Sequence, residues 1–371
     1  MALFEMLLAH AGIFCAEQAY HRVSRKIRET DFLCYDPKYL VDCYRDETGI
    51  TGTYLPYIEQ ERLLGNTWAE FLLAATSLRI TKVAKPFDLA KSPPPELSDF
   101  QAEALAQFKR EGKLDRDDPV LRLHAYNSQR KTLRVQRCNY SDGLRSNYAM
   151  DLKGHIKLGA ADVSFRAVLQ AQYGRRLPPL SDTRLSNAVG IAMVLFYKTE
   201  HGEILPYLPR RAKPGIVSET VGTTKKQAVF SGGYHCTASG ETMWKDAART
   251  FKEVFTQDMC RELYEEVGLT EQDLQWIHPV SFCRELLRGG KPQLFFAGFT
   301  KVPPSEINAR RRDAIQRQIR QGRQEIEDDV LIADTPEQLY AQLWSHGTIE
   351  AVANMTFAQD CAILAHRARQ F

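Results

Sequence analysis

One short segment constrains this 371-residue chain more than any other: residues 261–269 read RELYEEVGL. On an α-helix, Glu262, Glu265 and Glu266 are spaced i, i+3 and i+4, so three carboxylates project from one face. Like charges so placed repel each other, and a divalent cation would remove the conflict. Carboxylate oxygens are the donors that Mg²⁺ and Mn²⁺ prefer. The segment therefore predicts a helix with a metal-binding face.

The other positions of the segment predict how this helix packs and where it ends. Leu263 and Val267, spaced i and i+4, would form a buried stripe opposite the carboxylates. Gly268 stands where a helix needs a left-handed residue at its C-terminal end, and Leu269 would then return to the core. The helix is thus expected to pack with one face and bind metal with the other.

The segment resembles the signature helix of the Nudix hydrolases, whose pattern is Gx5Ex7REUxEExGU, where U is a bulky aliphatic residue. Every defined position of the second half is matched from Arg261 to Leu269. The resemblance implies an α/β/α sandwich around a mixed sheet, with Glu262, Glu265 and Glu266 as ligands of Mg²⁺ or Mn²⁺. It also implies that Arg261 positions the loop and helix through a salt bridge.

The first half of the pattern is less regular. Gly232 and Gly233 match the Gly-Gly turn that the family places ahead of the helix, and we expect them to shape the loop beneath the site. The family's Gly-Glu pair is present as Gly240 and Glu241. However, nineteen residues separate Glu241 from Arg261, about twelve more than the pattern has.

Two registers are therefore open for the acid that accompanies Arg261. In one, Glu253, which lies eight positions earlier, pairs with Arg261 and the helix is extended at its N-terminal end by roughly three turns. In the other, Glu241 keeps this role and residues 242–253 form an inserted loop or helix. The spacing favours Glu253.

Strand-like runs flank the motif. Residues 187–198 form an apolar run that is followed by turn residues and a hairpin partner. After the motif, residues 277–287 and 292–302 predict a second hairpin. Near its turn, Arg284 and Arg288 could contact a phosphate or a base, or could equally be exposed charges at strand ends.

Acidic residues beyond the hairpin could complete the site. In Nudix enzymes a further Glu outside the motif often binds metal or acts as base, and Glu325 and Glu327 are candidates by their order along the chain. Six arginines precede them and could form an anion-binding face or a solvated helix surface. These are Arg310, Arg311, Arg312, Arg317, Arg320 and Arg323.

Two proline-containing breaks, at residues 93–95 and 175–182, divide the chain. They predict a helical N-terminal region at 1–92, a linker with a small α/β accessory segment at 93–182, and a Nudix-like domain at 183–371. The expected class is α+β, with a mostly helical N-terminal region that has some β structure.

Composition limits the partners. There are 49 Lys and Arg against 46 Asp and Glu, and the net charge of +3 is too small to indicate nucleic acid or an anionic membrane. No run approaches the ~20 apolar residues of a membrane span. The eight cysteines form no CxxC pair, and the apolar first eighteen residues lack the basic start of a signal peptide. A cytoplasmic protein is expected.

The expected activity is a Mg²⁺-dependent hydrolysis of a diphosphate linkage in a nucleoside diphosphate derivative, such as a nucleotide sugar, an ADP-ribose-like compound, a dinucleotide or a nucleoside triphosphate. The alternative is a catalytically weak, Nudix-like module that senses a nucleotide. The N-terminal half could be a lid, a dimerisation element of a homodimer, or a second binding domain.

Overall fold

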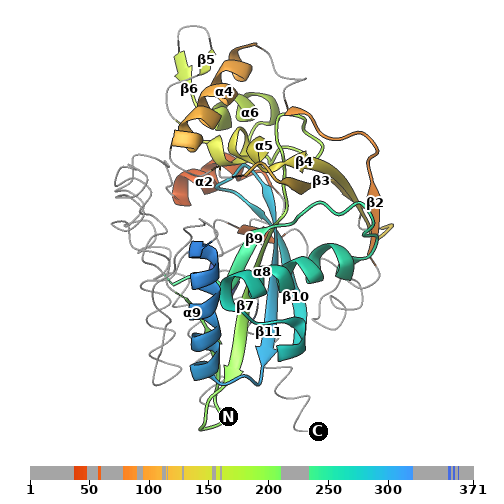
Figure 1. Ribbon diagram of the computed structural model, residues 1–371. Coiled ribbons are helices and arrows are strands. Elements are labelled where there is room, and N and C mark those ends of the chain that lie inside the picture. The colour runs from red at the N-terminus through yellow and green to blue at the C-terminus, as the bar shows by residue number, and fades with distance from the viewer. Residues whose placement is uncertain are drawn as a thin grey trace.

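The computed structural model describes a mixed α/β protein (Figure 1). The described residues are 37–47, 57–59, 78–89, 95–110, 114, 116–127, 129–152, 156–158, 161–209, 234–320, 350, 351, 354, 355 and 358. Among the helices within these ranges, none is long and apolar enough to cross a membrane.

The largest sheet has six strands in the order β1-β10-β11-β7-β8, with β9 also paired to β7. Its strands are β1 (Tyr57–Glu59), β7 (Gly190–Lys198), β8 (Ile204–Tyr207), β9 (Ala238–Glu241), β10 (Leu274–Glu285) and β11 (Lys291–Thr300). The two predicted hairpins are confirmed as β7-β8 and β10-β11, both antiparallel. Because β11 and β7 run parallel, the sheet is mixed, as expected.

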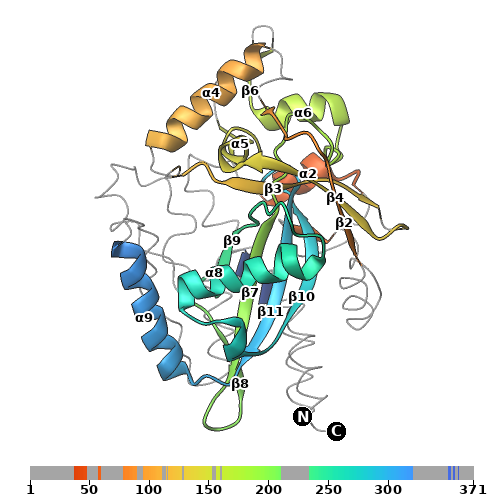
Figure 2. The ribbon, with the colours of Figure 1, turned by 45° about the vertical axis from the view of Figure 1, so that its right-hand side comes forward.

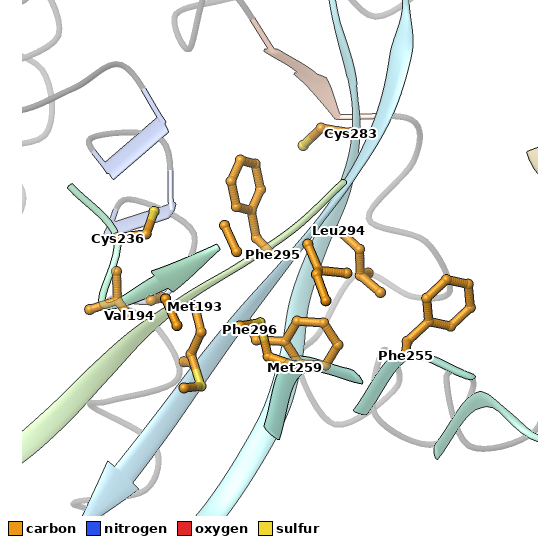
Figure 3. Close-up of a cluster of buried hydrophobic side chains, with 14 of the residues drawn as sticks. Met193, Val194, Cys236, Phe255, Met259, Cys283, Leu294, Phe295 and Phe296 are labelled. Carbon is orange, nitrogen blue, oxygen red and sulfur yellow. The ribbon is translucent and has the colours of Figure 1, made fainter. Parts of the chain in front are cut away.

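The centre of this sheet is apolar on both faces, which explains the continuous apolar runs of β7 and β11. Successive side chains of a strand point to opposite faces. Figure 3 shows Leu294 and Phe296 pointing toward Met259, while Phe295 and Val194 point the other way. The sheet is therefore the core of the C-terminal half and needs a cover on each face.

Helices cover this sheet. The motif helix α8 (Gln257–Val267), preceded by one π-helical turn, η4 (Lys252–Thr256), crosses one face (Figure 2). Helix α9 (Pro304–Arg320) lies beside α8. On the opposite face, Glu350 accepts a hydrogen bond from Gln293.

The described elements from α2 to α6, apart from β1, form an accessory half with its own sheet and helices, gathered at one end of the main sheet (Figure 1). Its three-stranded sheet has the order β2-β4-β3. The elements are α2 (Pro37–Tyr44), β2 (Arg79–Lys82), α4 (Pro95–Arg110), β3 (Pro119–Asn127), β4 (Thr132–Asn139), α5 (Tyr140–Leu144), η2 (Asn147–Ala149), β5 (Ile156–Leu158), β6 (Ala161–Val163) and α6 (Phe165–Tyr173). A second apolar core, which includes Phe100 and Phe165, lies among them.

A buried guanidinium joins the two halves. Arg166 on α6 is fully buried and donates to both carboxylate oxygens of Asp151, at 2.8 and 2.5 Å. It also donates to the carbonyl oxygens of Leu286 and Leu287 in the β10-β11 turn, and to the hydroxyl of Tyr44. The accessory half therefore holds the tip of the main hairpin.

Replacing Arg166 with Met should lower the free energy of unfolding by about 3–5 kcal/mol, because it leaves the Asp151 carboxylate buried without its partner. Urea denaturation followed by circular dichroism measures the loss. The double variant Arg166→Met/Asp151→Asn is the control, and it should recover part of the stability because no buried charge is left. An unchanged midpoint for Arg166→Met would contradict this role.

Candidate functional site

The motif helix ends as the sequence predicts. Gly268 has a φ of 80°, in the left-handed region, and its N–H donates to the Tyr264 carbonyl oxygen. A Cβ at Gly268 would also lie 2.8 Å from the Arg310 carbonyl oxygen on α9. Leu263 and Val267 are fully buried, so the predicted apolar stripe is confirmed. Backbone conformation and helix packing both require a glycine at this end.

Two carboxylates of the acidic face lie against β9. Glu262 is 8% exposed, and a Cβ on Gly240 would lie 2.2 Å from its Oε1 atom. Glu266 Oε2 accepts a hydrogen bond from the Ser239 N–H at 3.3 Å. Gly240 thus lets the strand approach the helix closely enough to receive the Glu262 carboxylate.

Arg261 holds the acidic face together. Its guanidinium lies 3.1 Å from Asp258 Oδ1, 2.6 Å from Glu262 Oε1 and 3.3 Å from Glu265 Oε2. Burial raises the pKa of Glu262 to about 8; Arg261 opposes this shift, whereas Glu265 and Asp258 add to it. Burial also disfavours the charge on Arg261, but its acidic neighbours outweigh that and raise its pKa. The cation and the acids of this helix are electrostatically interdependent.

The pairing of Glu253 with Arg261 was a wrong prediction. The Glu253 carboxylate accepts the N–H groups of Arg249 and Thr250 at 2.8 and 2.9 Å, and Thr250 Oγ1 in turn accepts the Glu253 N–H. Glu253 therefore caps the start of the helical segment, and these hydrogen bonds lower its pKa. Asp258, which the sequence interpretation missed, is the acid N-terminal to Arg261. Its i, i+3 spacing from Arg261 was the available signal.

Glu241 does not pair with Arg261 either. Its Oε1 atom lies 2.9 Å from Lys291 Nζ and accepts a hydrogen bond from the Tyr148 hydroxyl at 2.5 Å. Lys291 is 1% exposed, so this is a buried ion pair. Of the second register, the insertion is present, since an irregular loop at residues 242–250 separates β9 from the helical segment. The pairing of Glu241 with Arg261 that this register requires is not present, because Glu241 binds Lys291 and Tyr148 instead.

The two arginines of the second hairpin hold the fold together. Arg284 is buried and donates to the carbonyl oxygens of Gly290 and Pro178, and burial lowers its pKa to about 10. It is therefore not an exposed charge at a strand end. Arg288 lies 3.2 Å from Glu285 Oε2 and over the ring of Tyr148. Both arginines thus make contacts within the protein.

The remaining predicted residues fall into two groups: some lie outside the described residues, and others have partners within the protein. Gly232, Gly233, Glu325 and Glu327 lie outside the described residues. On α9, Arg310 forms ion pairs with Glu306 and Asp273, at 2.5 and 2.8 Å, and Arg317 lies over the ring of Tyr264. These two arginines have partners within the protein.

The motif carboxylates fit a metal in donor type. Glu262, Glu265 and Glu266 offer hard oxygen atoms from one helix face, which suits Mg²⁺ or Mn²⁺. Arg261 already engages Glu262 and Glu265. Within the described ranges, no three His, Cys, Asp or Glu side chains are gathered closely enough to hold an ion. The donors are therefore present, but their closed arrangement around a metal is not.

Substituting Gly240 with Ala tests the contact between β9 and Glu262. The added methyl group would displace the carboxylate, and we expect a loss of about 1–3 kcal/mol in the free energy of unfolding. Adding Glu262→Ala should make the substitution at Gly240 nearly neutral, because the clash disappears. Thermal denaturation of the four proteins of this cycle gives the coupling energy, and a coupling of zero would show that the contact is absent.

Comparison with known proteins gives only partial likenesses. No protein-family model and no curated protein matches the chain. Among solved structures, it is similar to a mutT/nudix family protein from Listeria innocua, with 17% identity over 49% of this chain and 96% of that one, at a TM-score of 0.30. The Nudix hydrolase RenU from M. smegmatis shows 10% identity over 48% and 88% of the chains, at 0.25. An Ap4A hydrolase from C. elegans shows 15% identity over 48% and 98%, at 0.24. Each likeness covers about half of this chain, at a TM-score too low to carry a functional argument.

Proposed function

We propose that the protein is a Mg²⁺-dependent hydrolase that cleaves a diphosphate linkage in a nucleoside diphosphate derivative. The observation that carries this proposal is the acidic face of α8, where Glu262 and Glu266 lie against β9, and Glu262 and Glu265 share the Arg261 guanidinium. The substrate class includes nucleotide sugars, ADP-ribose-like compounds, dinucleotides and nucleoside triphosphates.

The energetic cost of this face supports a functional role. Burying a carboxylate next to other carboxylates is unfavourable, and burial raises the pKa of Glu262 to about 8. A helix selected only for stability would place an apolar residue at this buried position. Strongly shifted carboxylates gather at functional sites, where binding or chemistry requires them.

Each of the residues around the acidic face has a part in this site. A bound Mg²⁺ or Mn²⁺, held by Glu262, Glu265 and Glu266, would polarise phosphoryl oxygens and acidify a water molecule. Arg261 fixes the Glu262 and Glu265 carboxylates through its guanidinium. The Ser239 N–H fixes Glu266. The backbone of β9 and one arginine thus set the directions in which the three acids point.

One observation favours a second candidate, a nucleotide-sensing module without turnover. Arg261 neutralises two of the three motif acids, and the described part of the chain gathers no three-ligand metal cluster. A domain that binds a nucleotide without hydrolysing it has no need of a metal at this face. The two candidates differ in whether divalent cations are required.

Hydrolysis by the purified full chain tests the first candidate. With Mg²⁺, a panel of the four substrate classes should yield phosphate-bearing products detectable by ³¹P NMR. Glu265→Gln should lower kcat about 100-fold or more, because a metal ligand is lost. The matched control is Glu271→Gln, since Glu271 is an exposed acid paired with Lys252. An inert native protein, or full activity in Glu265→Gln, would refute the hydrolase.

Calorimetry separates the sensor from the enzyme. The hydrolase should bind Mg²⁺ in the absence of nucleotide, and Glu265→Gln should weaken that binding. Nucleotide binding that is equal with and without Mg²⁺, in a protein that shows no turnover, would instead support the sensing module.

A further inference from the structure

The loop at residues 242–250, between β9 and the motif helix, is docked on the three-stranded sheet β2-β4-β3, called here the accessory sheet. The Leu121 N–H donates to the Thr242 carbonyl oxygen at 2.8 Å, and the Trp244 N–H donates to the Pro119 carbonyl oxygen at 3.0 Å. Both partners belong to the β3 region. The loop therefore continues the hydrogen bonding of a sheet whose strands lie more than 100 residues earlier in the chain.

A lysine of the accessory sheet, Lys82, forms hydrogen bonds with the middle of this loop. Lys82, at the end of β2, donates from Nζ to the carbonyl oxygens of Lys245 and Asp246. The same ammonium lies 4.8 Å from the ring centroid of Trp244, a cation–π distance. Because one side chain holds two carbonyl groups and one ring, Lys82 fixes the course of the loop.

The loop is tied in turn to the motif helix through Asp258. This carboxylate is fully buried and accepts the Met243 N–H at 2.5 Å. It also lies 3.3 Å from Lys245 Nζ and 3.1 Å from Arg261 Nε. A buried carboxylate depends on such partners, so its position follows that of the loop. Asp258 thus connects the loop directly to the guanidinium that holds Glu262 and Glu265.

We propose that Lys82 and Asp258 are positioning residues of the motif site, and that the accessory sheet orients Arg261 through the 242–250 loop. The proposal rests on the proposed function for its catalytic consequence, but the position of Arg261 is measurable without activity. If the loop moves away, Asp258 loses the Met243 and Lys245 donors, and Arg261 becomes its remaining partner. The guanidinium is then drawn toward Asp258 and away from the other two acids.

The test variant is Lys82→Met, which removes the ammonium but keeps a similar side-chain length. Lys82 is only partly buried, so the variant should fold. Lys85→Met is the matched control, because Lys85 is an exposed lysine three residues further along the same segment. Lys82→Arg is the rescue, since a guanidinium can donate to two carbonyl groups and stack on Trp244.

Two measurements follow these variants. The first is hydrogen exchange of the Met243 amide and of the Arg261 Nε–H group, read by NMR, with Arg261→Lys to assign the second signal. We expect about tenfold faster exchange in Lys82→Met, because the loop opens locally. The second is steady-state kinetics, where kcat should fall about tenfold while KM stays near the native value. Lys82→Arg should restore both.

The outcomes distinguish the two proposals. Native exchange at both groups in Lys82→Met, or native kcat despite faster exchange, would overturn the positioning role. Equal effects of Lys85→Met would also overturn it, because they would show a general response to lost charge. If the native chain hydrolyses nothing, the proposed function fails, and exchange at the Arg261 Nε–H group alone then supports or overturns the positioning of Arg261.

Discussion

The site depends on one guanidinium shared among three carboxylates. Without Arg261, the acids Asp258, Glu262 and Glu265 would repel one another on adjacent turns of a single helix. A planar group with five donors can satisfy several acids at once, which a lysine ammonium on a flexible stem does less well. The close approach of β9 and the docking of the loop both act on the acids that this cation holds.

Local patterns in the sequence predicted the elements of the C-terminal half. The i, i+4 spacing of Leu263 and Val267 and the position of Gly268 depend on the helix alone, and both interpretations are confirmed. The apolar runs that form β7 and β11 are likewise local features, and the strands predicted from them are confirmed. Such features are encoded within ten residues or so, where backbone geometry and burial dominate.

Pairings between distant residues were not predictable in this way. Glu253 has the expected spacing, but the N–H groups of its own helix start are nearer partners than Arg261. Arg284 could equally have been an exposed strand-end charge, yet its burial is tolerable because it donates to the carbonyl oxygens of Gly290 in its own hairpin and of Pro178, 106 residues earlier. In both cases competition among partners decides the outcome, and one sequence does not show which partner is close.

Strand β9 lies between two groups of opposite charge, the Glu262 carboxylate and the Lys291 ammonium, and this fixes its register. Gly240 faces the Glu262 carboxylate, whereas Glu241 faces the ammonium of Lys291. A slip of one residue would exchange the faces and bring a fourth acid against the motif helix. Electrostatic interactions therefore fix the register of β9 before the chain enters the 242–250 loop. Consequently the nineteen residues between Glu241 and Arg261 can exceed the spacing of the pattern that the segment resembles while Gly240 still faces Glu262.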